Sequence, residues 1–227
     1  NSYNTAMGYS AGESVTTGQF NTLIGGEAGD ALTVGTRNVA YGYASLSSDT
    51  KGSKSVAVGI NALFTQNFTT ATDAYNVAVG TDAGGAVTTG KFNNLFGGLA
   101  GDALTTGDSN TAIGYVALSS DTKGERAVAV GEGALFSQNF TSETSNYNTA
   151  IGYNAGYAVT TGVQNTLIGG LAGDAITTGS FNSSMGFNSL GANTTGARNA
   201  ALGYSALGVN TTGDFNVAVG MYSLDAN

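Results

Sequence analysis

A nine-residue pattern of polar and apolar positions recurs thirteen times in this chain of 227 residues. It reads Asn, Thr or Val, Ala, a large apolar residue, Gly, two variable residues, Ala or Ser, and finally Gly or Leu. The copies begin at residues 4, 21, 38, 55, 76, 93, 110, 127, 148, 165, 182, 199 and 216. Most steps between starts are therefore seventeen positions, which define a short repeat, and two are twenty-one, which define a long repeat. Self-similarity at a short fixed period predicts one structural unit stacked on itself.

The first residues of each copy alternate as a β-strand does. In the copy at Asn148, Thr149 and Ile151 point to one side and Ala150 points to the other. The fourth position is always large or branched, and the third is Ala or Leu in most copies, so both faces of the strand are apolar or nearly so. Such a strand must be covered on both faces. We expect one cover to be the interior of the coil and the other to be a neighbouring chain.

Glycine occupies the fifth position of every copy, which predicts a corner with positive φ or a close backbone approach. A second corner, Thr-x-Gly, follows in the ten complete short repeats. Two short strands and two corners per unit describe one coil of a parallel β-solenoid. A helix would lose about 1 kcal/mol at each repeated Gly. The sequence therefore predicts an all-β rod of thirteen coils, about 60 Å long at a rise of about 4.8 Å per coil.

Eleven of the thirteen copies open with Asn, the exceptions being Ser55 and Ala127. Stacked amides can bond from coil to coil, so we interpret this column as part of the scaffold. Three short repeats and one long repeat make a longer period, which groups the coils into super-repeats at 4–75, 76–147 and 148–227. We expect residues 1–227 to form a single solenoid domain within a longer fibre.

Composition excludes several kinds of chemistry. The chain has no Cys and no His, which removes thiolate sites, the commonest general base and the commonest metal ligand. The net charge of −8 argues against nucleic acid as a partner. No apolar run approaches the ~20 residues that a membrane helix needs, so we expect no direct membrane insertion. The sequence predicts no enzyme activity, no cofactor and no metal site.

Three features of the repeat have both a ligand-binding and a structural interpretation. Asp30, Asp102 and Asp174 stand in GG-x-AGDA segments that resemble a calcium-binding β-roll repeat, but a turn-forming Asp fits the sequence better. A column of Thr residues could form an ice-binding face, although turn capping next to Gly is the simpler interpretation. Aromatic residues recur at the sixth position and before the next Asn, where they could hold glycans or fill a seam between chains.

The two long repeats carry candidate receptor contacts, because loops on a rigid scaffold are where recognition usually occurs. The equivalent segments run from Phe64 to Thr69 and from Phe136 to Thr141. The candidate residues are Phe64, Gln66, Asn67, Phe68, Phe136, Gln138, Asn139 and Phe140. The alternative is that these Phe side chains pack back onto the coil.

Phrases such as SVAVGINAL at Ser55–Leu63 and NTAIGYVAL at Asn110–Leu118 resemble the head repeats of trimeric autotransporter adhesins, the YadA-like family. Similar arrays, often with NTTG as at Asn193–Gly196, occur in bacteriophage tail fibres. The resemblance covers essentially the whole chain, although even the short repeat is longer than is usual in adhesin heads. It implies a left-handed parallel β-roll assembled as a parallel homotrimer.

The function implied is that of a structural fibre or adhesin segment, extracellular on a cell surface or on a virion. Its partners would be further copies of itself and a cell-surface glycan or protein receptor. The competing hypothesis is a solenoid that binds a ligand such as a glycan or ice.

Overall fold

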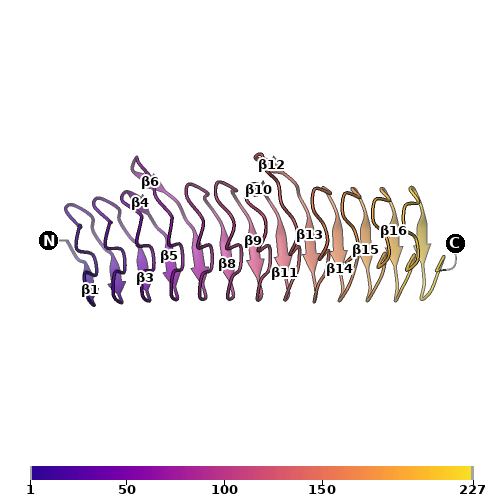
Figure 1. The fold of residues 1–227 in the computed structure, drawn as a ribbon, viewed down its shortest axis with the longest axis horizontal. Coiled ribbons are helices and arrows are strands. Elements are labelled where there is room, and N and C mark those ends of the chain that lie inside the picture. The colour runs from indigo at the N-terminus through magenta and orange to yellow at the C-terminus, as the bar shows by residue number, and fades with distance from the viewer. Residues whose placement is uncertain (1, 226–227) are drawn as a thin grey trace.

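The computed structural model describes residues 2–225, which form a rod of stacked coils with one sequence repeat per turn (Figure 1). No helix is present in this range. One strand from each repeat joins a single parallel sheet of thirteen strands that runs the length of the rod. The predicted parallel β-solenoid of thirteen coils is therefore confirmed.

The strands of this sheet are short and evenly spaced. They are β1 (Thr5–Met7), β2 (Thr22–Ile24), β3 (Val39–Tyr41), β5 (Val56–Val58), β7 (Val77–Val79), β8 (Asn94–Phe96), β9 (Thr111–Ile113), β11 (Val128–Val130), β13 (Thr149–Ile151), β14 (Thr166–Ile168), β15 (Ser183–Met185), β16 (Ala200–Leu202) and β17 (Val217–Val219). Neighbours pair in register, with Thr111 opposite Val128 and Ile113 opposite Val130.

The register decides which strand face lies inside the coil. The middle residue of each strand points inward and is buried in all strands after β1, as Ala40 and Leu95 illustrate. The first and third residues point outward and form the outer face of the sheet. A shift of one residue would exchange the two faces. The strands therefore contribute mainly Ala and Leu to the interior, and their Val, Ile, Met and aromatic side chains lie on the outer face.

The part of each coil that follows the conserved Gly, called the return half below, differs from the expectation of a second short strand. The residues at the seventh and ninth positions adopt left-handed conformations, as Leu99 (φ 57°) and Leu118 (φ 54°) show. Alternating left-handed residues kink the backbone, so it cannot extend. Backbone bonds still join successive coils, for example from Gly101 N to Ala117 O at 2.9 Å. The prediction of two strands per unit was thus wrong for the short repeats, except for those that start at residues 38 and 110, which contain the two-residue strands β4 (Gly52–Ser53) and β10 (Gly124–Glu125).

Two side-chain positions on the return half share one interior space. In six coils the ninth position is Gly and the twelfth is Val, Leu or Ile, whereas in six others the ninth is Leu and the twelfth is Asp, Gln or Asn. A Cβ built on Gly101 would lie 2.9 Å from Leu104 Cδ1, and one on Gly173 would lie 2.7 Å from Ile176 Cδ1. Because only one large apolar group fits, a Leu at the ninth position leaves the twelfth for a polar side chain.

The Asn column forms a ladder of hydrogen bonds in three stretches, from Asn4 to Ser55, from Asn76 to Ala127 and from Asn148 to Asn216, which confirms its interpretation as scaffold. Asn93 N donates to Asn76 Oδ1 at 2.9 Å, and Asn93 Nδ2 donates to Gly107 O at 2.9 Å. The amide thus joins one coil to the next and also satisfies the second corner. At the coil where Ala127 replaces Asn, Asn146 Oδ1 takes over and accepts from Asn148 N at 2.9 Å.

The Gly corner after each strand has both properties expected of it. Gly114 has φ 138°, and a Cβ built on it would lie 2.5 Å from Gly131 O in the next coil. Equivalent glycines therefore stack backbone on backbone along the rod. No other residue type combines this conformation with this contact.

Replacing one of these glycines tests the stacking. We expect Gly114→Ala to destabilise the rod by more than about 2 kcal/mol, because it combines a strained φ with a clash against backbone. Gly98→Ala is the matched control, since the nearest atom to its Cβ would be Tyr115 Cδ2 at 3.6 Å and its φ is not positive. Chemical unfolding followed by circular dichroism measures both. Equal losses in the two variants would contradict the stacking argument.

Candidate functional site

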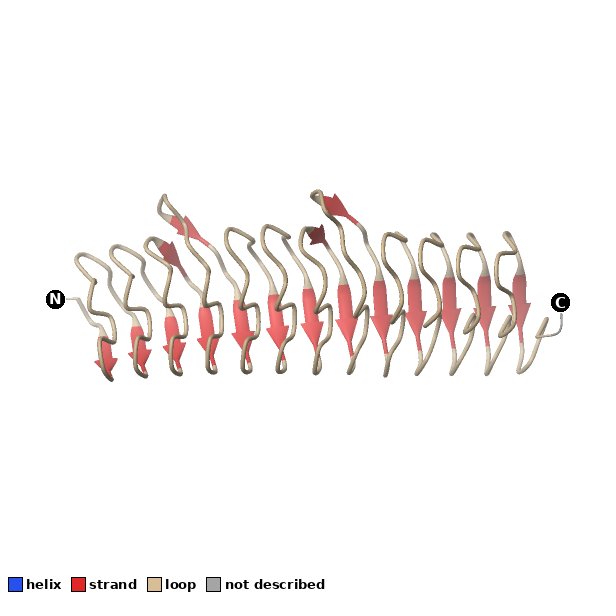
Figure 2. Ribbon diagram, viewed as in Figure 1, coloured by secondary structure: helices blue, strands red, loops and turns tan. Residues whose placement is uncertain are grey.

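Two loops project from the same edge of the rod, one from each long repeat (Figure 2). In the first loop, β6 (Thr72–Asp73) pairs with β4 (Gly52–Ser53) of the preceding short repeat. In the second, β12 (Thr144–Ser145) pairs with β10 (Gly124–Glu125) of the short repeat before it. The loops lie four coils apart because the super-repeat contains four units. They are the most prominent irregular features of the rod.

A buried polar network anchors the first loop. Gln66 Nε2 donates to Asp49 Oδ2 at 2.6 Å and to Ser55 Oγ at 3.1 Å. Gln66 Oε1 accepts from Asn76 Nδ2 at 2.8 Å. Asp49 Oδ1 in turn accepts from Gly52 N at 2.9 Å. The network joins the loop to the coil below it and to the Asn ladder of the coil above.

The second loop repeats this arrangement. Gln138 Nε2 donates to Asp121 Oδ2 at 2.6 Å, and Asn148 Nδ2 donates to Gln138 Oε1 at 2.8 Å. Asp121 Oδ1 also accepts from Phe140 N at 3.0 Å. Burial raises the pKa of the Asp121 carboxyl, and the bonds from Gln138 and from backbone N–H groups oppose that rise.

Four of the eight predicted receptor contacts are part of the scaffold. Gln66 and Gln138 are fully buried, while Phe68 and Phe140 are 5% and 6% exposed. These four side chains are almost fully buried, so they are corrected from candidate contacts to loop anchors. Only an edge of Phe68 reaches the surface, where it borders the groove described below. The physical reason for the Gln burial is that each amide bonds a buried Asp of the preceding coil and a buried Asn of the following coil.

The other four candidates lie at the surface. Phe64, Asn67 and Asn139 are exposed, and Phe136 is partly exposed. Phe136 stacks on the ring of Tyr157 in the next coil, with ring centroids 5.0 Å apart. These four stay candidate contacts. Sequence reasoning missed Asp49 and Asp121, although the repeated LSSDTKG segment that contains them was a signal.

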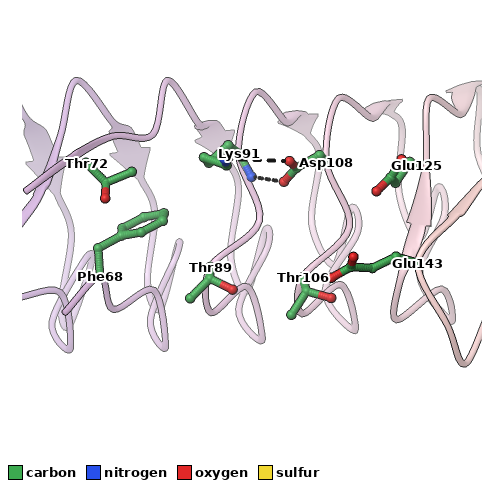
Figure 3. A pocket seen from close by; sticks show the side chains of 8 residues that line it. All are labelled: Phe68, Thr72, Thr89, Lys91, Thr106, Asp108, Glu125 and Glu143. Carbon is green, nitrogen blue, oxygen red and sulfur yellow. Dashed lines mark hydrogen bonds and ion pairs between the residues drawn. The ribbon is translucent and has the colours of Figure 1, made fainter. Parts of the chain in front are cut away.

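A polar groove lies between the two loops, with a volume of about 410 Å³ (Figure 3). Its walls come from the loops and its floor from the coils between them. The lining residues are Phe68, Thr72, Thr89, Lys91, Thr106, Asp108, Glu125 and Glu143. The sequence pattern contained no sign of this groove, because its residues come from several coils.

Charge in the groove is predominantly negative. Asp108 Oδ1 accepts from Lys91 N at 2.7 Å, and Lys91 Nζ lies 3.9 Å from Asp108 Oδ2. Burial raises the pKa of Asp108, nearby Glu125 and Glu143 raise it further, and Lys91 opposes them. Carboxylates, threonine hydroxyls and one ammonium group together favour a ligand rich in hydroxyl groups.

The Asp residues of the calcium-like segments sit in turns. Leu104 N donates to Gly101 O at 3.1 Å across the turn that contains Asp102, and the turn at Asp174 is equivalent. Burial raises the pKa of both carboxyls. In residues 2–225 no group of three or more His, Cys, Asp or Glu side chains could hold a metal ion.

The Thr column is occupied by hydrogen bonding within the rod. Thr105 Oγ1 donates to Thr122 O at 2.9 Å, and Thr177 Oγ1 donates to Thr194 O at 3.1 Å. Equivalent bonds recur along the column. Hydroxyls that are directed at backbone carbonyls support the turn-capping interpretation over an ice-binding face.

The outer face of the sheet is an apolar strip that extends along the whole rod. It consists of the third residues of the thirteen strands, all of which are apolar or aromatic. The first residues lie beside them and are mixed, since Val and Ala alternate there with Thr, Asn94 and Ser183. Met7 is 65% exposed and Tyr41 is 55% exposed. Near the C-terminal end the strip is hollowed by a cavity of about 260 Å³ between Met185, Leu202 and Val219. Large exposed apolar patches usually mark an interaction site.

Substituting the buried and exposed members of one candidate segment tests their separate roles. We expect Gln138→Leu to cost about 1–3 kcal/mol, because it removes the partner of the buried Asp121 Oδ2 and one of the two bonds of Asn148 Nδ2. Asn139→Ala should change stability by less than about 0.5 kcal/mol, because that side chain is exposed. Thermal unfolding of both variants provides the comparison. A loss at Asn139 as large as that at Gln138 would contradict the anchoring role.

No helix in residues 2–225 is long and apolar enough to cross a membrane. Comparison with known proteins finds no matching family model, no matching curated protein and no matching solved structure.

Proposed function

We propose that this chain is a structural segment of a fibre or adhesin, a rigid rod that assembles as a parallel homotrimer outside a cell or on a virion surface. Its role is mechanical: it sets distance and stiffness, and its loops display contacts for a receptor. The proposal assigns the chain no enzymatic activity.

The apolar strip is the observation that carries this proposal. It is continuous over about 60 Å of rod and is uncovered in the single chain. A soluble monomer rarely exposes an apolar surface of this extent, because water contact with it is unfavourable. Packing the strips of parallel copies around a common axis would cover it evenly along the rod. The sequence resemblance to trimeric adhesin heads supports three copies.

Measuring the mass in solution tests the assembly. A single chain has a mass of 22.5 kDa, so we expect a particle of about 68 kDa for three chains by light scattering. Ile113→Asp and Ile151→Asp together should dissociate it, because they place two charges in the strip. Val209→Asp is the control, since Val209 is similarly exposed but lies on the return half. A wild-type protein that stays at 22.5 kDa would sink the proposal.

A second candidate function is glycan binding in the groove between the loops. The polar lining and the volume of about 410 Å³ favour it, because sugar hydroxyls bond to carboxylates, hydroxyls and ammonium groups. Binding on a glycan array should disappear in Thr89→Tyr, which fills the groove. It should persist in Thr178→Tyr, which has the same place within its repeat but lies in the third super-repeat, where no loop flanks the coil. Equal binding by both variants would place any glycan elsewhere.

A further inference from the structure

Two columns of side chains border the apolar strip along its long edges. The leading border consists of the residue that directly precedes each repeat, and the trailing border consists of the two residues that follow the conserved Gly. The leading residues are Tyr3, Phe20, Arg37, Lys54, Tyr75, Phe92, Ser109, Arg126, Tyr147, Gln164, Phe181, Arg198 and Phe215. The trailing border includes Tyr9, Glu27, Tyr43, Asp82, Tyr115, Glu132, Tyr153, Phe187 and Tyr204.

The leading border is a stack of aromatic and cationic side chains. All thirteen residues have φ between 51° and 63°. Because they share one left-handed backbone conformation, their side chains leave the coil in the same direction and form one column. Tyr3 and Phe20 stack with centroids 5.2 Å apart. Arg198 lies 5.1 Å from the ring centroid of Phe181 and 5.4 Å from that of Phe215. The border holds four cations and no acidic residue.

The trailing border has the opposite charge. It carries Glu27, Asp82 and Glu132 and no basic residue. The two columns that directly border the strip therefore differ in charge: among their charged residues, the leading one carries only bases and the trailing one only acids. Acidic residues further from the strip, such as Asp73 and Glu125, pair with two of these bases within the chain.

We propose that the leading border of one copy packs against the trailing border of the next, so that parallel copies associate in register. This inference rests on the proposed assembly and names the contacts that set its direction. Parallel rods that face a common axis bring opposite borders together, as in any head-to-tail ring. Antiparallel rods bring like borders together and leave the three acidic residues opposite a border that has no base.

The positions of charges along the rod match this arrangement. Arg126 precedes β11 and Glu132 follows it, so copies at the same height place the two side by side. Arg37 precedes β3 and Glu27 follows β2, the adjacent strand. Lys54 precedes β5 and Asp82 follows β7, also its neighbour. Adjacent strands are about 4.8 Å apart, a distance that these long side chains can span.

Aromatic residues follow the same correspondence. Tyr3 and Tyr9 flank β1, Tyr147 and Tyr153 flank β13, and Phe181 and Phe187 flank β15. In-register copies would bring each pair together across the seam, where aromatic rings pack favourably. Lys54 and Arg126 already pair with Asp73 and Glu125 within the chain, each at 2.6 Å. The contact between copies would extend these pairs into charge networks.

Charge reversal and exchange test the inference. We expect Arg37→Glu with Arg126→Glu to raise the concentration at which the assembly dissociates by about tenfold or more, because like charges then meet across the seam. Glu27→Arg with Glu132→Arg should have a similar effect. The variant that combines all four changes should recover to within about threefold of the wild type. Analytical ultracentrifugation over a dilution series measures each, and circular dichroism confirms that each variant folds.

Lys51→Glu with Lys123→Glu is the matched control, because these bases occupy equivalent positions outside both borders and outside the groove, and it should leave assembly unchanged. Reversals that weaken assembly without recovery in the combined variant would overturn the pairing. Reversals no more disruptive than the control would overturn it as well, and would leave the borders open to a glycan or another partner. A wild type that does not assemble at all would instead defeat the proposed function itself.

Discussion

The in-register stacking of equivalent atoms is the constraint on which the whole molecule depends. Each Gly corner contacts the corner of the next coil so closely that a Cβ would lie 2.3–2.6 Å from the neighbouring backbone carbonyl, as at Gly8 and Gly203. The Asn amides bond between coils in the same register, for example Asn165 N to Asn148 Oδ1 at 2.9 Å. A change in the length of one coil must therefore be accommodated outside this column.

The two loops show how that accommodation is made. The four extra residues of each long repeat form a loop that projects from the edge opposite the Gly corner. The strand of that repeat therefore stays in register with the strands of the neighbouring coils. The space at the twelfth position then holds Gln66 or Gln138 instead of an apolar side chain. That exchange is possible because Leu63 and Leu135 already fill the interior. The super-repeat thus follows the way each coil fills its interior: either with an apolar residue at the twelfth position beside Gly at the ninth, or with Leu at the ninth position beside a polar twelfth residue.

Hydrogen bonding within the rod also determines which surfaces are free to bind a partner. Thr hydroxyls, Asn amides and most backbone groups find partners within the rod, so these polar groups have little capacity left for a ligand on those faces. The outer face of the sheet is different, since it is apolar and its two borders carry opposite charges. An apolar face supplies the driving force for association, whereas charged borders mainly set orientation and register. The apolar third-residue column runs the length of the rod, whereas the charged border residues stand at particular coils and can therefore fix the register.

The sequence by itself determined the solenoid, its thirteen coils, the Gly corners and the Asn ladder, because each repeats at a period that only stacking explains. It could not decide which strand face is interior, since Ala150 and Ile151 are both apolar. It also could not show that Gln66 and Phe68 are buried while Asn67 is exposed. Those outcomes depend on partners such as Asp49 and Asn76, which lie 10–17 residues away along the chain. Only the closed coil brings such residues together, so the tertiary structure alone decided them.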